Sequence, residues 1–584
     1  MGELSESDFA RFREAIEARL DGTDAPLAVL EDGLLDREDV VTETDRLIGG
    51  FAALGLIAGD RIALFCRDDR MLILLVIAAL RAGLAPVMGD ANAKPSEAME
   101  LLGTCRPAAI FADGETLAVI RGQANIPSGQ MVEVDNAVLF VDASPRKRLP
   151  EGTAPPEIAL MIFTSGTTSA PKAVELTYAN LTAQFEVFAE VYGFDTDTRL
   201  LNLLPLHHVD GLIRGPLTAL WFGGTVYRRV EFSVQNVPMI LDSVAIDGIT
   251  HFITVPAMLR IIDRVGQDQR SAFNTPNFRF LLSSADHLNT PLWSRFEEAF
   301  GVPVANAYGL SEVVCDAVFA GPSDDTRRIG SIGRAVRVEA RIVDKDGHRV
   351  PHGQVGELTL SGPTIMRGYF NAPKLTAEVL KGEVFHTGDL VREADDGLLE
   401  FAGRKKTAIV SAGVTIYPEG IAEVISSMVG ISEAYVFGEP DDIRGERLVA
   451  AVSSDTVARD DIWTFCRENL SPERVPAEIR MVDKLPRGAS GKVIVAELVH
   501  AGGGDTNSSE ETVYSLASAC FKVPVSALHP DSTPFNTEGW DSLAHMALIE
   551  ELEEAFDVVF SASEIAEITS LGQVEALIKA GGSG

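Results

Sequence analysis

Residues 164–172 read Thr-Ser-Gly-Thr-Thr-Ser-Ala-Pro-Lys and follow an apolar run, 158–163, that is typical of a buried strand. A second short strand is expected at 173–177. The loop between these strands is rich in hydroxyl groups and ends in a lysine, which suits a polyanion such as a phosphate chain. An ordinary polar turn has the same composition, and the Gly-x-x-x-x-Gly-Lys-Ser/Thr nucleotide loop is absent. The loop alone therefore leaves both interpretations open.

Composition excludes several classes of protein. The chain has 584 residues, enough for several domains, with 46% hydrophobic and 23% charged residues. Its net charge of −35 argues against a nucleic-acid partner, because phosphate contacts need a basic face. The five cysteines are scattered and include no Cys-x-x-Cys pair, which favours a reducing compartment. The most apolar segment, 71–80, is too short to span a bilayer. We therefore expect a cytoplasmic protein with no membrane span.

Strands and helices alternate along the N-terminal half of the chain. A turn followed by a strand is expected within 55–65, further strands are expected at 199–205 and 278–283, and helices such as 71–82 and 180–191 lie between strands. This alternation predicts an α/β fold on parallel sheets, in which ligands gather where the strands end.

The character of the chain changes after residue 330. Valine-rich alternating segments with glycine turns, 330–387, indicate a small β-barrel or meander. A compact α+β region follows, then a Gly/Ser-rich linker and an acidic helical segment. We expect a large N-terminal core at 1–403, a small subdomain at 404–500, a linker at 501–509 and a helical domain at 510–580.

Three further strings carry groups suited to a nucleotide. Residues 308–312, Tyr-Gly-Leu-Ser-Glu, combine an aromatic ring that could stack on a base with a carboxylate that could bind Mg²⁺. Asp389 follows a glycine turn and could accept two ribose hydroxyls. Arg404 and the segment 486–492 add cations on glycine-bearing loops. Each string alone is also compatible with a plain turn or a capping carboxylate.

In this order the strings resemble the adenylate-forming superfamily, which includes acyl-CoA synthetases, nonribosomal peptide adenylation domains and luciferases. The resemblance spans residues 55–492. It implies a large N-terminal domain of α/β sheets plus a small β-barrel, a small mobile α+β C-terminal subdomain, and a site between them that uses ATP and Mg²⁺. The chemistry agrees, because a lysine placed between a carboxylate and the α-phosphate stabilises the charge that develops when the two anions meet.

The resemblance also implies roles for individual residues. The catalytic groups would be Lys172, His208, Arg404 and Lys492. The nucleotide-binding positions would be Thr164, Ser165, Gly166, Thr167, Thr168, Ser284, Ala285, Asp286, Tyr308, Gly309, Ser311 and Asp389. Glu312 would hold Mg²⁺, Lys406 would be the hinge, and Gly413 would line the tunnel for the thiol.

The chain departs from the family pattern at several positions. Ser169 and Ala173 stand where the family usually has glycine, and Gly488 replaces a threonine. Gly420 and Ala422 interrupt an acidic pair. None of these changes removes a charged catalytic group, so we expect activity.

The acidic C-terminal segment contains the triplet Asp541-Ser542-Leu543, followed by apolar residues at helical spacing. Such a triplet can be a simple helix N-cap. Behind a flexible linker it resembles acyl or peptidyl carrier domains, four-helix bundles whose serine bears 4′-phosphopantetheine. The resemblance implies a phosphopantetheinyl transferase as a partner, and a helix N-terminus at Ser542 would favour the phosphodiester. Cys520 is expected to be buried and inert.

The sequence also bears on the acid that is activated. Amino-acid-activating relatives usually have an aspartate where His208 falls, which argues against an ordinary α-amino acid. Asp210 and Arg214 are four residues apart and are expected to pair on a helix. Alternatively, Arg214 could bind a second carboxylate or Asp210 a distant amine.

We expect an AMP-forming acid–thiol ligase that activates a small carboxylic acid as acyl-AMP and loads its own carrier, with downstream biosynthetic enzymes as partners. The alternatives are a ligase that uses free CoA and a catalytically silent scaffold whose carrier is loaded in trans.

Overall fold

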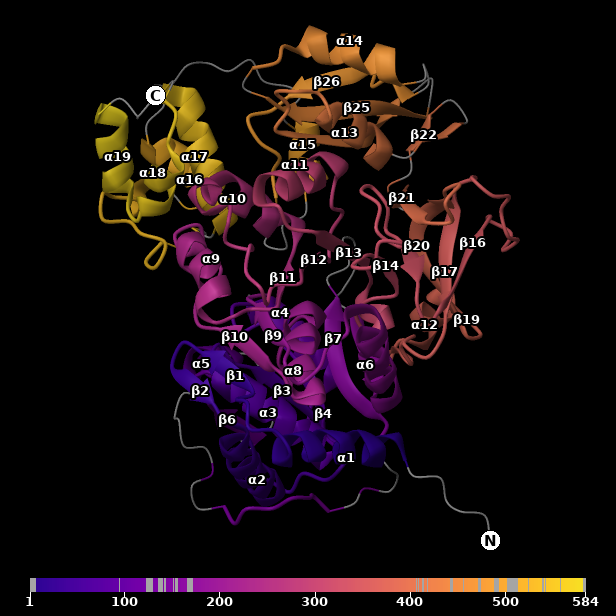
Figure 1. The fold of residues 1–584 in the computed structure, drawn as a ribbon, viewed down its shortest axis with the longest axis vertical. Helices are drawn as coiled ribbons and strands as arrows, with labels where there is room; N and C mark the ends of the chain where they lie inside the picture. The colour runs from indigo at the N-terminus through magenta and orange to yellow at the C-terminus, as the bar shows by residue number, and fades with distance from the viewer. Residues whose placement is uncertain are drawn as a thin grey trace.

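The computed structural model describes residues 7–580 except 94, 122–129, 135–139, 141–142, 151, 153–155, 165–171, 406, 408, 412–413, 417, 442–444, 455, 471–473, 488–492, 501–512, 522, 524, 538–539, 541 and 557. Four sheets organise the described chain, and helices cover them (Figure 1). Among the described helices, none combines the length and the apolar character needed to cross a membrane.

The central sheet has nine strands in the order β15-β14-β13-β12-β11-β9-β10-β1-β2. The pairs β10–β9, β9–β11, β11–β12 and β12–β13 are parallel. Their strands therefore end at one edge of the sheet. The bounds are β1 Ala28–Leu30, β2 Gly33–Leu35, β9 Arg199–Asn202, β10 Thr225–Arg228, β11 His251–Thr254, β12 Phe280–Ser283, β13 Val304–Tyr308, β14 Val318–Ala320 and β15 Arg334–Ala335.

A second sheet has seven strands in the order β18-β8-β7-β4-β3-β5-β6. Strands β7 and β8 are the antiparallel pair that flanks the hydroxyl loop, and Thr164 pairs with Lys172 in their register. The bounds are β3 Arg61–Phe65, β4 Ala85–Met88, β5 Ala109–Ala112, β6 Met131–Glu133, β7 Ile158–Thr164, β8 Lys172–Thr177 and β18 Gly368–Tyr369.

Helices cover these two sheets. α3 shows how the sequence builds the core, because the Asp68 side chain caps its first turn, Gly83 ends it at φ 76°, and all residues from Met71 to Ala82 are buried. The bounds are α1 Asp8–Asp21, α2 Arg37–Ala53, α3 Asp69–Ala82, α4 Pro95–Cys105, α5 Gly114–Arg121, α6 Tyr178–Tyr192, α7 Val209–Leu212, α8 Thr218–Phe222, α9 Val237–Ile246, α10 Pro256–Val265, α11 Thr290–Phe300 and α12 Pro373–Val379.

The region expected as a small β-barrel or meander forms an antiparallel sheet in the order β16-β17-β20-β19, with β21 also paired to β20. A fourth sheet, β23-β22-β25-β24 with β26 on β25, forms the α+β subdomain with its helices. The bounds are β16 Glu339–Val343, β17 Gly356–Ser361, β19 Leu380–Lys381, β20 Val384–Glu393, β21 Leu399–Arg404, β22 Ile409–Ser411, β23 Val414–Ile416, β24 Glu433–Asp441, β25 Gly445–Ser453, β26 Glu478–Met481, α13 Pro418–Ser426, α14 Arg459–Asn469 and α15 Val495–His500.

The C-terminal segment is helical, as the sequence predicts, with α16 Val513–Phe521, α17 Ser542–Phe556, α18 Ala562–Glu567 and α19 Leu571–Ala580. Leu548, Ile549 and Leu552 of α17 are fully buried. The rings of Phe521 and Trp540 stack with centroids 4.5 Å apart.

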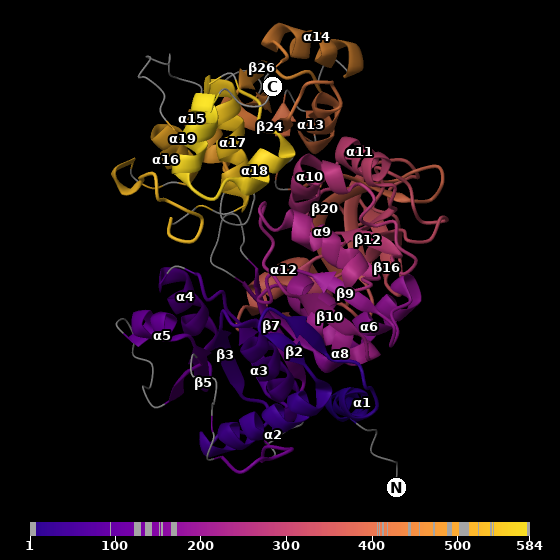
Figure 2. The ribbon, with the colours of Figure 1, turned by 60° about the vertical axis from the view of Figure 1, so that its left-hand side comes forward.

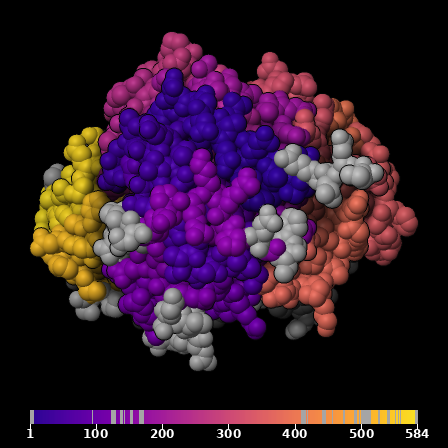
Figure 3. Space-filling model, turned by 90° about the horizontal axis from the view of Figure 1, so that it is seen from below, coloured from indigo at the N-terminus to yellow at the C-terminus, as the bar shows by residue number. Residues whose placement is uncertain are grey.

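The helical domain does not stand apart from the rest. Figures 1 and 2 show α16–α19, in yellow, beside α10 and close to the α+β subdomain. Seen from below, the N-terminal part fills the centre, with the yellow C-terminal residues on one flank and residues coloured salmon to orange on the other (Figure 3).

Candidate functional site

The loops after β12 and β13 form the centre of the site, at the edge where the parallel strands of the nine-stranded sheet end. Ser284 is completely buried, and Ala285 has φ 68°, a left-handed conformation that costs an L-residue energy. Backbone strain of this kind gathers at ligand-binding turns.

The turn at Gly309 has a steric reason. A Cβ added there would lie 1.5 Å from the Cys315 carbonyl oxygen, so only glycine fits. Five residues on, Val314 has φ 73°, which is exceptional for a β-branched side chain. These two positions fold residues 308–316 into a tight unit.

Asp389 joins this unit to the β20–β21 strands. It is buried, and its Oδ2 accepts a 2.7 Å hydrogen bond from the Tyr308 hydroxyl. Arg404 Nε lies 3.2 Å from Asp389 Oδ1. Burial, reinforced by the Asp389 charge, raises the pKa of Tyr308 well above its ordinary value, so the phenol stays a hydrogen-bond donor. The structure therefore brings together three of the residues predicted to contact the nucleotide.

Glu312 and Lys172 meet through an aromatic ring. The Tyr369 hydroxyl donates to Glu312 Oε1 at 2.8 Å, and Lys172 Nζ lies 5.1 Å from the centroid of the same ring. Among the described residues, no group of three or more His, Cys, Asp and Glu side chains could hold a metal. A single carboxylate nevertheless fits Mg²⁺, because this ion commonly takes one or two carboxylates together with substrate phosphates.

A buried ion cluster lies behind Ser284. Arg214 Nε donates to Asp316 Oδ2 at 3.0 Å, Nη2 donates to Asp316 Oδ1, and Nη1 donates to Asp210 Oδ1 and Ser284 Oγ. The Tyr192 hydroxyl also donates to Asp316, at 3.1 Å. The predicted Asp210–Arg214 pair is present, but Asp316 is a second partner that the sequence analysis did not identify.

His207 and His208 precede this cluster, with ring centroids 4.3 Å apart. Burial, and then the neighbouring His208, lower the pKa of His207 to about 4. Burial also lowers the pKa of His208, although Asp210 and Asp90 oppose this effect. Both rings are therefore neutral at pH 7, and His208 can donate or accept a proton without first losing a charge.

Several predicted site residues lie outside the described residues: Ser165, Gly166, Thr167, Thr168, Lys406, Gly413 and Lys492. Thr164 is described only as the last residue of β7. Asp286 and Ser311 lie on the loops that carry Ser284 and Glu312, and the Asp286 amide donates to the Ser284 carbonyl oxygen at 2.9 Å.

The predicted attachment serine sits at an interface. Ser542, the first residue of α17, donates from its hydroxyl to the Phe232 carbonyl oxygen at 3.2 Å. Gln235 Nε2 lies 3.3 Å from His545 Nδ1 and donates to the Ile568 carbonyl oxygen at 3.1 Å.

Two ion pairs complete this interface, which we call the carrier dock. Arg264 of α10 pairs with Glu553 at 2.5 Å, and Lys484, just after β26, pairs with Glu551 at 3.2 Å. Lys484 Nζ also lies 2.8 Å from Cys520 Sγ. Cys520 is only half-buried and touches a cation, so the expectation of a buried residue was wrong.

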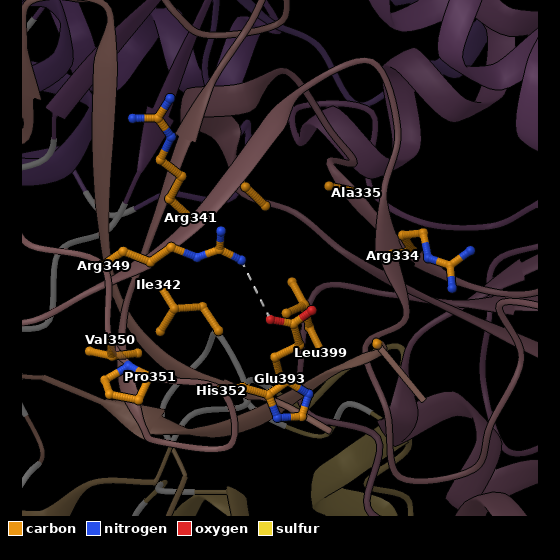
Figure 4. A pocket seen from close by; sticks show the side chains of 12 residues that line it. Arg334, Ala335, Arg341, Ile342, Arg349, Val350, Pro351, His352, Glu393 and Leu399 are labelled. Carbon is orange, nitrogen blue, oxygen red and sulfur yellow. Dashed lines mark ion pairs between the residues drawn. The ribbon is translucent and has the colours of Figure 1, made fainter. Parts of the chain in front are cut away.

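A hollow of about 430 Å³ lies elsewhere, on the β16–β21 region (Figure 4). Arg349 reaches across it toward Glu393 at 3.8 Å, and Arg341 pairs with Glu339. Its arginines are exposed and have acidic partners, and its lining includes none of the predicted site residues. We therefore do not assign the reaction to it.

The sheets, the loops at the ends of their strands and the C-terminal helical domain agree with an adenylate-forming enzyme fused to a carrier, and the family models identify this class. Three families match in order: AMP-binding enzyme over residues 23–370, AMP-binding enzyme C-terminal domain over 420–492 and phosphopantetheine attachment site over 511–578. The chain belongs to the AMP-binding enzyme family, as an AMP-forming acid–thiol ligase fused to a C-terminal carrier domain.

Curated relatives agree with the family, and a solved structure agrees with the fold. The sulfoacetate–CoA ligase of Cupriavidus necator is 32% identical over 470 residues, which cover 78% of this chain and 90% of that protein. The oxalate–CoA ligase of Arabidopsis thaliana is 33% identical over 344 residues, 58% of this chain and 66% of that one. ATP-bound MatB from Rhodopseudomonas palustris shares the fold with a TM-score of 0.75 at 24% identity, covering 83% of this chain and 98% of its own.

Sequence reasoning missed Asp316 and Tyr369 as parts of the site. A signal for Asp316 existed, since an acid inside the apolar run Val313–Val318 must find a cationic partner once buried. Arg214, inside another apolar run, is that partner. Tyr369 had no comparable signal, because its contact with Glu312 depends on β18 pairing with β8.

Proposed function

We propose that this enzyme uses ATP to convert a carboxylic acid to acyl-AMP and transfers the acyl group to the 4′-phosphopantetheine thiol of its own carrier domain. The observation that carries the proposal is the carrier dock, with Ser542 hydrogen-bonded to Phe232. Phe232 follows β10, which runs parallel to β9, so Ser542 lies toward the edge that also bears Ser284 and Tyr308.

In the first step, a carboxylate oxygen of the acid attacks the α-phosphorus, and pyrophosphate leaves with the bonding electrons. Lys172 and the hydroxyl loop would hold the pyrophosphate, and Lys492 would lie between the reacting anions. Asp389 and Arg404 would hold the ribose side, and Ser284, Ala285, Asp286 and Tyr308 would frame the adenine. Mg²⁺, held by Glu312, would neutralise charge on the phosphates.

In the second step, the sulfur attacks the acyl carbon and loses its proton to solvent, the bond from the acyl carbon to the phosphate oxygen breaks, and AMP leaves with the bonding electrons as the thioester forms. The group on Ser542 supplies the thiol, and a serine at the N-terminus of the 15-residue helix α17 suits its phosphodiester. A tethered thiol reaches millimolar effective concentration when the linker spans the gap. A hinge at Lys406 and a tunnel at Gly413 would let the two steps use different entrances.

The proposal includes the division into a core at 1–403, a subdomain at 404–500, a linker at 501–509 and a carrier at 510–580. A phosphopantetheinyl transferase would modify Ser542 in the cytoplasm, and downstream biosynthetic enzymes would take the acyl group.

Intact-mass measurement of the phosphopantetheinylated protein with ATP and an acid tests the proposal. We expect an increase equal to the acid minus water, at a rate independent of protein concentration. The Ser542→Ala variant should keep acid-dependent ATP–pyrophosphate exchange and gain no mass. A rate proportional to protein concentration would indicate loading between molecules and contradict self-loading.

Free CoA as the acceptor is the second candidate, favoured by relatives named as CoA ligases. Adding CoA to the same reaction separates the two. If acyl-CoA forms much faster than the thioester on Ser542, the CoA ligase is correct and the proposal fails.

A further inference from the structure

Arg214 is buried and is committed to protein partners. Its side chain is only 2% exposed, and Nε, Nη1 and Nη2 all donate to protein oxygens. Asp316, its bidentate partner, is completely buried. A guanidinium held in this way is a structural group rather than a receptor for a second carboxylate.

The cluster therefore presents negative charge. One guanidinium stands between the carboxylates of Asp210 and Asp316, which leaves an excess of one anion. His207 and His208 do not compensate, because burial keeps both rings neutral at pH 7. Asp90, 4.0 Å from His207 Nε2, adds a further negative charge.

Asp210 is the accessible member of the cluster. Its side chain is 18% exposed, against 2% for Arg214. Its side-chain contacts with Arg214 and Ser284 both use Oδ1, and no hydrogen bond to Oδ2 is found among the described residues. Asp210 reaches from α7, which follows β9, to Ser284 just after β12, so its carboxylate lies at the strand-end edge beside the proposed nucleotide loop.

We propose that Asp210 determines specificity by accepting a hydrogen bond from a protonated amine of the substrate, so that the activated acid is an amino acid whose amine is not on the α-carbon. The inference rests on the proposed function. An anionic substituent would face like charge, which costs several kcal/mol in binding when the groups are desolvated. An uncharged substituent would leave Asp210 Oδ2 desolvated and unpaired. The sulfoacetate and oxalate ligases, by their names, take acids with a second acid group, so this chain would differ from both.

ATP–pyrophosphate exchange with matched acids tests the inference. One set is 3-aminopropanoate, butanoate and butanedioate, and the other is 3-(aminomethyl)benzoate, 3-ethylbenzoate and 3-(carboxymethyl)benzoate; both amines are alkylamines and are protonated at pH 7. We expect the amine-bearing member of the accepted set to exceed both others by at least about tenfold in kcat/KM, because each 1.4 kcal/mol of differential binding is tenfold.

The Asp210→Asn variant tests the residue itself. Asparagine can still accept from Arg214, so the variant should fold and keep exchange, while the preference for the amine falls to within about threefold, mainly through KM. Asp210→Glu restores the negative charge and should recover part of the preference for the amine. If Asp210 only maintained the structure, restoring the charge would not restore the selectivity.

The outcomes separate the two proposals. If exchange occurs and the uncharged or dianionic acid is preferred, this inference is overturned and the proposed function stands. If Asp210→Asn leaves the selectivity unchanged, the assignment to Asp210 is wrong. If exchange occurs only with acids that lack a distant amine, such as 2-aminopropanoate, the inference is overturned and the proposed function stands. If no carboxylic acid of a wider panel supports exchange, the proposed function itself fails.

Discussion

The Arg214 cluster and the carrier dock both depend on ion pairs, but in opposite environments. Arg214 and Asp316 are 2% and 0% exposed. At the dock, Arg264 and Glu553 are 31% and 19% exposed. Removing the partner of a buried charge costs several kcal/mol of free energy of unfolding. A partly exposed ion pair contributes little free energy and is screened by salt.

This difference matches what each region must do. The cluster fixes the positions of three charged groups behind Ser284, and its burial keeps them in place. Under the proposed function the carrier approaches the site, accepts the acyl group and then moves away, so we expect its contacts to break readily. We expect substitutions in the buried region to act on folding and selectivity, and those at the dock to act on the rate of loading.

The largest effect is expected for Asp316→Ala. The variant leaves Arg214 buried with a single carboxylate, and breaking a buried pair costs about 3–5 kcal/mol. Urea denaturation of the full chain measures the loss in free energy of unfolding. Asp325→Ala, in an exposed pair with Arg334, is the control and should change stability by less than about 0.5 kcal/mol. Equal losses in both variants would remove the distinction between buried and exposed pairs.

His545 makes the carrier sensitive to acid. Burial lowers its pKa from 6.5 to about 4, and Trp540 Nε1 donates to its Nδ1 at 3.1 Å, so Nε2 carries the proton and donates to Ile565. The folded state therefore stays neutral while the unfolded state takes up a proton as the pH falls below 6.5. The contribution of neutral His545 to the free energy of unfolding is fully present above that pH. It falls by about 1.4 kcal/mol per pH unit down to pH 4.

Urea midpoints of the full chain at pH 7 and pH 4.5 measure this effect. His545→Gln should show a weaker loss of stability than the wild type over that interval. The same loss in both proteins would assign the acid sensitivity to other groups.

Asp389→Asn tests a buried carboxylate in the nucleotide site. The variant keeps the shape but removes the charge that faces Arg404 and the hydroxyl of Tyr308. We expect kcat/KM for ATP in the exchange assay to fall by about 100-fold, which corresponds to ~2.7 kcal/mol. Asp396→Asn, on the exposed turn before β21, is the control and should be close to wild type. A fall of less than threefold for Asp389→Asn would exclude a direct role.

The smallest effect is expected at the dock. Arg264→Glu places like charges opposite each other, but an exposed pair is worth only about 0.2–1 kcal/mol, so loading should slow by about two- to fivefold with exchange unchanged. The double change with Glu553→Arg should restore the rate, and 0.5 M NaCl should reduce the difference. Arg341→Glu, far from the carrier, is the control. A loss as large as that of Ser542→Ala would show that the dock is not a weak contact.

Much of the secondary structure was predictable because it follows from short-range sequence patterns. The strand expected at 158–163, which extends to Thr164 in the structure, the core helix that stops at Gly83 and the acidic helical domain each reflect apolar periodicity or a glycine stop. Tyr308, Asp389 and Arg404 were recognisable from their glycine-bearing strings, and the structure places them in contact.

The amino-acid sequence by itself determined which chemical groups are present: the hydroxyl loop with its lysine, the carboxylates, and a serine at a helix start. Only the tertiary structure decided which groups remain available to a ligand. Arg214 and Asp316 are 102 residues apart and meet because β9, β12 and β13 end at one edge of a sheet. Burial there ties Arg214 to acids and leaves Asp210 partly open, a result that depends on packing in three dimensions rather than on spacing along the chain.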